Sequence, residues 1–183
     1  MKHLMIDLET YGTVPGCGLV SIGAVFFDPT QDLSECLGAE LYVVVNRASC
    51  QAAGLHEDES TLGWWSTQRA EAREAFMQAT DNQGLDLPDA LAQLSAFVKR
   101  ETNVLIYGNG ADFDKPLLSA AYRAAGLKEP WRPYNGRCHR TLKAMFPEPV
   151  KLPREGAHHA LADARFQARQ LVSIAQHYLL ELK

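Results

Sequence analysis

Three strand-like runs follow one another at the start of the chain, before any segment with helical periodicity. Residues 2–8 are largely apolar, residues 19–27 are rich in β-branched and aromatic side chains, and residues 40–46 contain a Tyr-Val-Val-Val run. Glycines and a proline mark a turn at 11–18, and Asp28-Pro29 ends the second run. The pattern predicts an antiparallel meander.

Beyond residue 60 the periodicity becomes mainly helical. Apolar residues recur at helical spacing in 61–79, as one or two helices, and in 88–100. An apolar run at 103–107 predicts a fourth strand, followed by a helix over 112–125. Residues 129–153 hold five prolines around a short helix at 139–146, which predicts irregular surface structure. A long amphipathic helix is predicted from near residue 158 through 178.

Length and charge limit the class of protein. A chain of 183 residues is long enough for one substantial core and short for two, so we expect a single domain spanning 1–183. Its 46% hydrophobic and 22% charged residues are typical of soluble globular proteins. Because its net charge is -4, whereas broad nucleic-acid-binding surfaces are usually basic, any nucleic-acid role should depend on a local site with metal ions.

The four cysteines show no C-x-x-C spacing, and the N-terminus has no signal-peptide pattern. We therefore expect a reduced, cytoplasmic setting. Cys138-His139 resembles half of a zinc site, but no second pair is spaced to complete it, so we interpret the thiols as buried or idle. No apolar stretch approaches the roughly 20 residues of a membrane span, so no membrane association is expected.

Asp7 and Glu9 end the first strand-like run. Successive side chains of a strand point to opposite faces, so these two carboxylates share one face. Neighbouring anions raise each other's pKa unless a cation lies between them, and hard divalent cations prefer oxygen ligands. The pair indicates a metal site, although acidic pairs at this spacing are more often solvated strand ends.

Two further groups of candidates occur later in the chain. Asp112 and Asp114 follow the fourth predicted strand where a helix begins, a position at which aspartate commonly acts as a cap. His158 and His159 precede the last helix, and Asp163 lies in its early turns. Either group alone has an ordinary structural explanation.

Taken together, the pieces resemble the three motifs of the DEDDh (DnaQ-like) 3'-5' exonucleases. The matching segments are Asp7-x-Glu9, Phe113-Asp114 and His158-x-Ala160-x-x-Asp163. Each motif alone is weak, but their order and their placement on a strand, a helix start and the final helix make the combination specific. The longer matches at residues 6–10 and 21–25 are similar to the DexA-type and RNase AS-like branch of phage and bacterial exonucleases.

The resemblance implies an α/β ribonuclease H-like fold, in which a mixed central sheet of three antiparallel strands plus parallel strands is flanked by helices. It implies two Mg²⁺ or Mn²⁺ ions held by four carboxylates, with His158 as the general base toward the attacking water. The implied ligands are Asp7, Glu9, Asp114 and Asp163. The implied reaction is phosphodiester hydrolysis from the 3' end of single-stranded RNA or DNA, or of 3' overhangs, which releases nucleoside 5'-monophosphates.

Residues beside the motifs are assigned differently. Asp112 is assigned a helix-capping role, and His159 is expected to face the core or solvent because adjacent helical side chains diverge by about 100°. The chain departs from the family at Gly110, where many relatives carry asparagine and this chain has Asn109 one position earlier. That departure leaves the geometry of the loop open.

Substrate contacts are expected from Thr10, by analogy with the family, and from the tryptophan pair Trp64 and Trp65. A tryptophan is more often part of a core than a stacking platform, and consecutive helical residues do not share a face. We therefore expect one of the two to be buried, and the other is a candidate for stacking on a base.

Two other functions remain open on the sequence. A nuclease-fold module that binds nucleic-acid ends or a protein partner without cutting should have lost an acidic ligand, and none is missing. A proofreading exonuclease would need a polymerase supplied by a separate chain. The sequence specifies neither RNA nor DNA nor a base preference, and it shows no interface, although family members are often homodimers.

Overall fold

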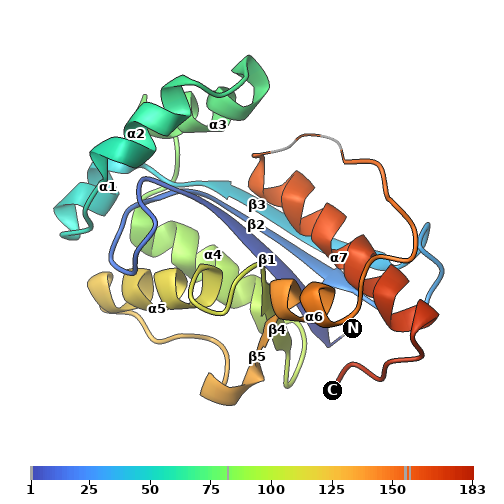
Figure 1. The fold of residues 1–183 in the computed structure, drawn as a ribbon. Helices are drawn as coiled ribbons and strands as arrows, with labels where there is room; N and C mark the ends of the chain where they lie inside the picture. Colours follow the sequence, from blue (N-terminus) through green and yellow to red (C-terminus); the bar gives the residue numbers. More distant parts are fainter. Residues whose placement is uncertain (1, 82, 155, 157) are drawn as a thin grey trace.

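The computed structural model describes residues 2–81, 83–154, 156 and 158–183 (Figure 1). Its centre is a five-stranded sheet in the order β3-β2-β1-β4-β5. The strands β1 (His3–Thr10), β2 (Leu19–Phe27) and β3 (Leu37–Val44) form the antiparallel meander. The short strands β4 (Leu105–Gly108) and β5 (Gly136–Cys138) continue the sheet in parallel pairing. The predicted mixed sheet is therefore confirmed.

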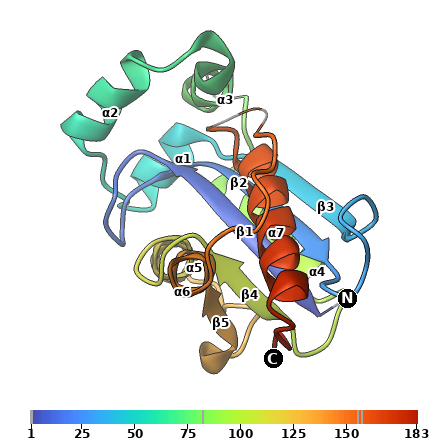
Figure 2. The same ribbon diagram turned by 45° about the vertical axis from the view of Figure 1, so that its right-hand side comes forward.

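Seven helices and one 3-10 turn accompany the sheet in the described part of the chain. They are α1 (Arg47–Ala52), α2 (Glu59–Ser66), α3 (Ala70–Thr80), α4 (Leu87–Val98), α5 (Asp114–Ala124), the turn Pro133–Asn135, α6 (His139–Met145) and α7 (Ala160–His177). Figure 2 shows α7 in front of the sheet and α4 behind it. The helices α1, α2 and α3 lie together at one end of the sheet (Figure 1).

The alternation of β1 determines which side chains meet which helices. Leu4, Ile6 and Leu8 belong to the main apolar cluster with residues of α4 and α5. Met5 belongs to a second cluster with residues of α7. Because side chains two apart share a face, Asp7 and Glu9 lie on the same face as Met5, which is the face that α7 covers.

A glycine on β2 allows α7 to begin directly against the sheet. Gly23 pairs with Asp7 in the antiparallel register. A Cβ atom at Gly23 would lie 2.2 Å from the carbonyl carbon of Ala160 and 2.2 Å from the amide nitrogen of Leu161, the first residues of α7. Any larger residue would push the helix away, so this close approach needs glycine. It brings the first turn of α7 beside the carboxylate face of β1.

Several element boundaries differ from the prediction. β1 extends through Thr10, so both acidic residues lie inside the strand. The segment 61–79 forms two helices, while α1 and β5 were not predicted. The helix α5 begins at Asp114 with Phe113 as its N-cap and no side-chain cap bond, so the capping role of Asp112 is wrong. Among the described residues, no helix combines the length and apolarity needed to cross a membrane.

Candidate active site

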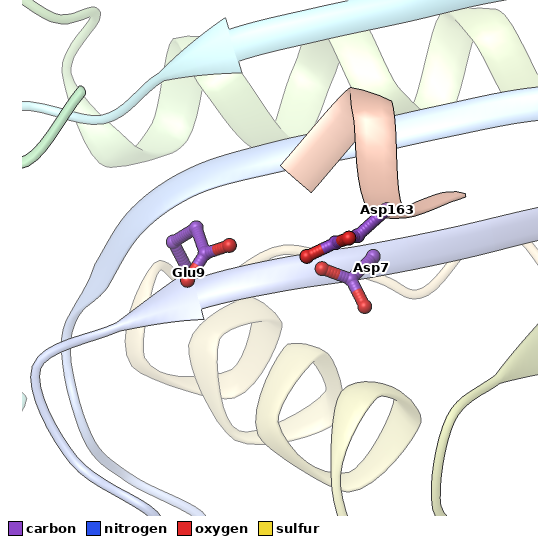
Figure 3. A group of neighbouring side chains, drawn as sticks. All are labelled: Asp7, Glu9 and Asp163. Carbon is purple, nitrogen blue, oxygen red and sulfur yellow. The ribbon is translucent and has the colours of Figure 1, made fainter. Parts of the chain in front are cut away.

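Three of the predicted ligands converge at the junction of β1 and α7. Asp7, Glu9 and Asp163 each offer a carboxylate oxygen, and these oxygens all lie within 4.8 Å of one another (Figure 3). Asp7 and Glu9 extend from neighbouring positions on one face of β1, and Asp163 reaches them from the first turn of α7. Glu9 and Asp163 are buried.

Asp114 approaches the same region from the start of α5. Its Oδ2 accepts a hydrogen bond of 2.7 Å from the backbone amide of Asn109. Its Oδ1 is buried and has no hydrogen-bond partner among the described residues. Gly108 makes room for this carboxylate, because a Cβ atom there would lie 2.7 Å from Asp114 Oδ2. Asp114 lies outside the tight three-carboxylate group, but its charge acts on that group.

The carboxylates destabilise one another's charged forms. Burial raises the pKa of Asp7 well above its ordinary value, and the charges of Asp114 and Glu9 add to this effect. Burial raises the pKa of Glu9 to about 8, with further contributions from Asp163 and Asp114. Burial also raises the pKa of Asp114 to about 6. Several buried carboxylates with little opposing charge are the electrostatic condition that a bound cation relieves.

The donor set fits a hard divalent metal. The four carboxylates supply only oxygen ligands, the type that Mg²⁺ and Mn²⁺ prefer. A buried carboxylate oxygen without a partner is costly in a folded protein, and Asp114 Oδ1 is such an atom among the described residues. The observed arrangement is therefore consistent with a metal centre at Asp7, Glu9, Asp114 and Asp163.

His158 lies at the entrance to α7 in an unusual backbone conformation, with φ at 65°. Its backbone amide donates a hydrogen bond of 2.9 Å to Asp163 Oδ2. Its ring lies edge-on to Trp64 at a centroid separation of 5.0 Å. The hydrogen bond ties the left-handed turn to a candidate metal ligand, which places the imidazole at the candidate site.

The neighbouring histidine has a different environment. His159 is the N-cap of α7, and its Nδ1 accepts a hydrogen bond of 3.4 Å from the backbone amide of Ala162. Its ring stacks on Tyr42 of β3 at 4.3 Å between centroids. The two histidines therefore occupy separate surroundings, one beside Trp64 and the other against the sheet.

These candidate residues line a cavity of about 500 Å³. Its lining residues are Asp7, Leu8, Glu9, Thr10, Thr13, Ser60, Thr61, Trp64, Trp65, Asn109, Phe113, Arg154, His158, Asp163 and Gln167. Apolar side chains line it beside the polar ones, as is usual for sites that hold small organic groups. Its volume lies within the ordinary range for such sites.

The two tryptophans have opposite exposures. Trp65 is 1% exposed, and its Nε1 donates a hydrogen bond of 2.9 Å to the carbonyl oxygen of Thr10. Trp64 is 42% exposed and lies edge-on to Trp65 as well as to His158. Trp65 thus supports the end of β1, while Trp64 presents a partly exposed indole to the cavity. Thr10 is itself buried, and its hydroxyl donates to the carbonyl oxygen of Gly12.

The loop around Gly110 places Asn109 beside the acidic cluster. Asn109 lines the cavity, and its Oδ1 lies 3.3 Å from His139 Nδ1. His139 is buried at the start of α6, and this burial lowers its pKa to about 4, so the ring is neutral at physiological pH. The asparagine one position early in the sequence therefore still reaches the site region.

Two residues of the site were not predicted. Gln167 Nε2 donates a hydrogen bond of 2.7 Å to Asp7 Oδ1. Its spacing of four residues from Asp163 places both on one helix face, which was an available signal. Arg154 donates from Nε and Nη2 to Asp163 Oδ1, at 3.1 and 2.9 Å. No periodicity marked Arg154, because it lies in irregular, proline-containing structure.

Two solved exonuclease structures share the fold. One is the nuclease domain of 3'hExo, a DEDDh family member bound to rAMP, with a TM-score of 0.62 and 14% sequence identity over 96% of this chain and 92% of that chain. The other is Exonuclease X in complex with 5' overhanging duplex DNA, with a TM-score of 0.59 and 16% identity over 98% and 94% of the two chains. At these identities the likeness shows the fold alone, which is the predicted α/β, ribonuclease H-like architecture.

No curated protein sequence matches this chain. A family model does match it, over residues 2–175, and this range includes all four candidate ligands and both histidines. The chain therefore belongs to the family of the 3'-5' exoribonuclease Rv2179c-like domain.

Proposed function

We propose that this protein is a metal-dependent 3'-5' exonuclease that acts on single-stranded nucleic acid and releases nucleoside 5'-monophosphates. The main supporting observation is that carboxylate oxygens of Asp7, Glu9 and Asp163 lie within 4.8 Å of one another in the wall of a cavity of about 500 Å³. The family description favours RNA as the substrate. The two structural neighbours were solved with a ribonucleotide and with DNA, so both nucleic acids belong in the test.

Asp7, Glu9, Asp114 and Asp163 would hold the metal. Two bound Mg²⁺ or Mn²⁺ ions would supply Lewis acidity at the scissile phosphate and lower the pKa of water at the site. In this arrangement Gln167 fixes the orientation of Asp7 through the bond from its Nε2. The backbone amide of His158 orients Asp163 in the same way through Oδ2.

His158 would remove a proton from the attacking water. The water oxygen then forms a bond to phosphorus, and the bond between phosphorus and the 3' oxygen of the preceding nucleotide breaks. The terminal nucleotide leaves as a 5'-monophosphate, and the shortened strand keeps its 3' hydroxyl after taking up a proton. The ring position beside Trp64 and the cavity supports this role, because a general base must reach the reacting water.

The first test asks whether nuclease activity requires a divalent metal and a free 3' end. Purified protein is incubated with 5'-labelled linear single strands of RNA and DNA in Mg²⁺ or Mn²⁺. The labelled products are resolved by length, and the released mononucleotides are identified by chromatography. We expect stepwise shortening from the 3' end, release of 5'-monophosphates and no turnover in excess chelator. A circular strand of the same sequence should remain intact. Cleavage of the circle, or full activity in chelator, would contradict the proposal.

A second test concerns the exposed tryptophan. If Trp64 stacks on a base, Trp64→Ala should weaken binding of a short single strand by roughly 1 to 3 kcal/mol, or about 5- to 150-fold in Kd. Fluorescence anisotropy with Ca²⁺ in place of Mg²⁺ measures binding. Tyr134→Ala is the control, because Tyr134 is also an exposed aromatic residue, at 71%, and does not line the cavity. Equal effects of both changes would remove Trp64 from the binding site.

The finer assignments belong to the same proposal. They are that the chain is a member of the DexA-type and RNase AS-like branch, that it forms a single exonuclease domain spanning 1–183, and that it is located in the cytoplasm.

A module that only binds nucleic-acid ends is not favoured, because all four carboxylates and His158 are retained. The same activity assay separates these alternatives, since a binding module would hold the strand without shortening it.

A further inference from the structure

Arg154 reaches back from the segment before α7 into the acidic cluster. Both Nε and Nη2 donate to a single oxygen, Asp163 Oδ1. The other oxygen, Oδ2, accepts from the backbone amide of His158. Both oxygens of Asp163 are therefore engaged, one of them by a cation. A metal ion that binds Asp163 must share this carboxylate with Arg154 or displace it.

The contact has the features of one that can be exchanged. Arginine holds a carboxylate most firmly when two parallel bonds reach two oxygens, whereas here both donors share one oxygen. The Arg154 side chain is 48% exposed, although that of Asp163 is only 6% exposed. The guanidinium therefore keeps contact with water while it pairs with a buried carboxylate. Arg154 can therefore be displaced from Asp163 when a metal ion takes over the compensation of this buried charge.

A second location for the guanidinium lies next to the first. Arg154 lines the active-site cavity and also a neighbouring cavity of about 630 Å³, whose wall includes Lys143, Lys151 and Phe166. The guanidinium carbon already lies 5.6 Å from the centre of the Phe166 ring. The wall of this second cavity holds one carboxylate, Glu148, whose Oε1 lies 4.0 Å from Lys143 Nζ. The side chain thus stands between an acidic site and a basic one.

Charge determines which location is favoured. Without metal, the acidic cluster attracts Arg154. Divalent cations at the same carboxylates would repel a guanidinium and replace its charge there. The released side chain would stand at the cavity wall, where a strand bound by its 3' end would present phosphates. A planar guanidinium matches a phosphate group well in shape and hydrogen bonding.

We propose that Arg154 is an exchangeable counter-ion: it occupies Asp163 in the metal-free protein, leaves when divalent ions bind, and then contacts a phosphate of the substrate strand. This inference rests on the proposed exonuclease function. It makes Arg154 a strand-binding residue that lies outside the three recognised motifs. It also predicts that one substitution changes metal binding and strand binding in opposite directions.

The test uses Arg154→Gln in the full chain. Calorimetry with Mn²⁺ and no nucleic acid should show metal binding about two- to fivefold tighter than in the parent, because a competing ion pair is lost. Anisotropy with a short single strand and Ca²⁺ should show binding weakened by roughly tenfold or more. The slope of log K against log salt should fall by about 0.7, as expected for one lost phosphate contact on a single strand.

Two matched variants complete the design. Arg165→Gln removes a guanidinium from α7 that pairs with Glu40, and it should change neither quantity. Arg154→Lys keeps the charge and should retain more strand affinity than Arg154→Gln.

If Arg154→Gln weakens metal binding and strand binding together, Arg154 is structural and the inference is wrong. The inference is also wrong if neither measurement changes. If the parent binds neither metal nor strand, the proposed function fails with it, which is a separate and recognisable outcome.

Discussion

Asp114→Asn is expected to abolish turnover while leaving the melting temperature close to that of the parent. The change keeps the side-chain shape but removes the charge of a buried carboxylate whose Oδ1 has no partner among the described residues. Metal-derived stabilisation of a transition state is worth several kcal/mol, so the expected loss is roughly 1,000-fold or more in kcat. The bond from the Asn109 amide to the other oxygen can persist in the variant, which preserves the fold.

The matched control is Asp112→Asn. Asp112 is exposed in the turn before α5 and supplies no cap to that helix. This variant should keep both its activity and its melting temperature. Steady-state kinetics on an end-labelled strand and thermal unfolding of both proteins provide the comparison. If Asp112→Asn were the inactive variant, the second motif would be assigned to the wrong aspartate.

His158→Ala is expected to reduce kcat by roughly 100- to 10,000-fold, the range for loss of a general base. Metal binding should survive, because the imidazole is not among the four proposed ligands and the backbone bond from residue 158 to Asp163 does not need a side chain. Calorimetry with Mn²⁺ and single-turnover kinetics separate these two properties.

His159→Ala should give the opposite pattern. His159 caps α7 and stacks on Tyr42, so its loss should lower the free energy of unfolding by about 0.5 to 1 kcal/mol. Its activity should remain within a few-fold of the parent. An active His158→Ala protein paired with an inactive His159→Ala protein would exchange the roles assigned to the two histidines.

A buried histidine contacts the side chain of Asn109 in the loop before α5. His139 is almost fully buried, and its lowered pKa leaves it uncharged beside Asn109. Asn109 thus joins two buried groups: its backbone amide donates to Asp114 Oδ2, and its side-chain Oδ1 lies 3.3 Å from His139 Nδ1.

Local periodicity determined a large part of the fold and of the site. The alternation of a strand placed Asp7 and Glu9 on one face, and the structure confirms that they share the face covered by α7. The strand-rich start, the helical middle and the long last helix were predicted for the same reason, because side-chain patterns repeat with the period of each element. The three-residue strand β5 was missed, since its existence depends on pairing with β4 rather than on its own sequence.

Tertiary structure decided how the pieces meet. The approach of α7 to β1 depends on Gly23, whose importance lies in the helix packed against it and not in its neighbours in the sequence. Trp65 is the buried tryptophan in the tertiary structure, where its indole stacks on Phe76 and donates to the carbonyl oxygen of Thr10. Gln167 meets Asp7 across 160 positions of the chain, and Arg154 meets Asp163 through an irregular segment. The sequence alone determined the types and the order of the chemical groups, because these follow local patterns. The distances between the groups were decided by packing across the sheet, which cannot be inferred from the periodicity of any one segment.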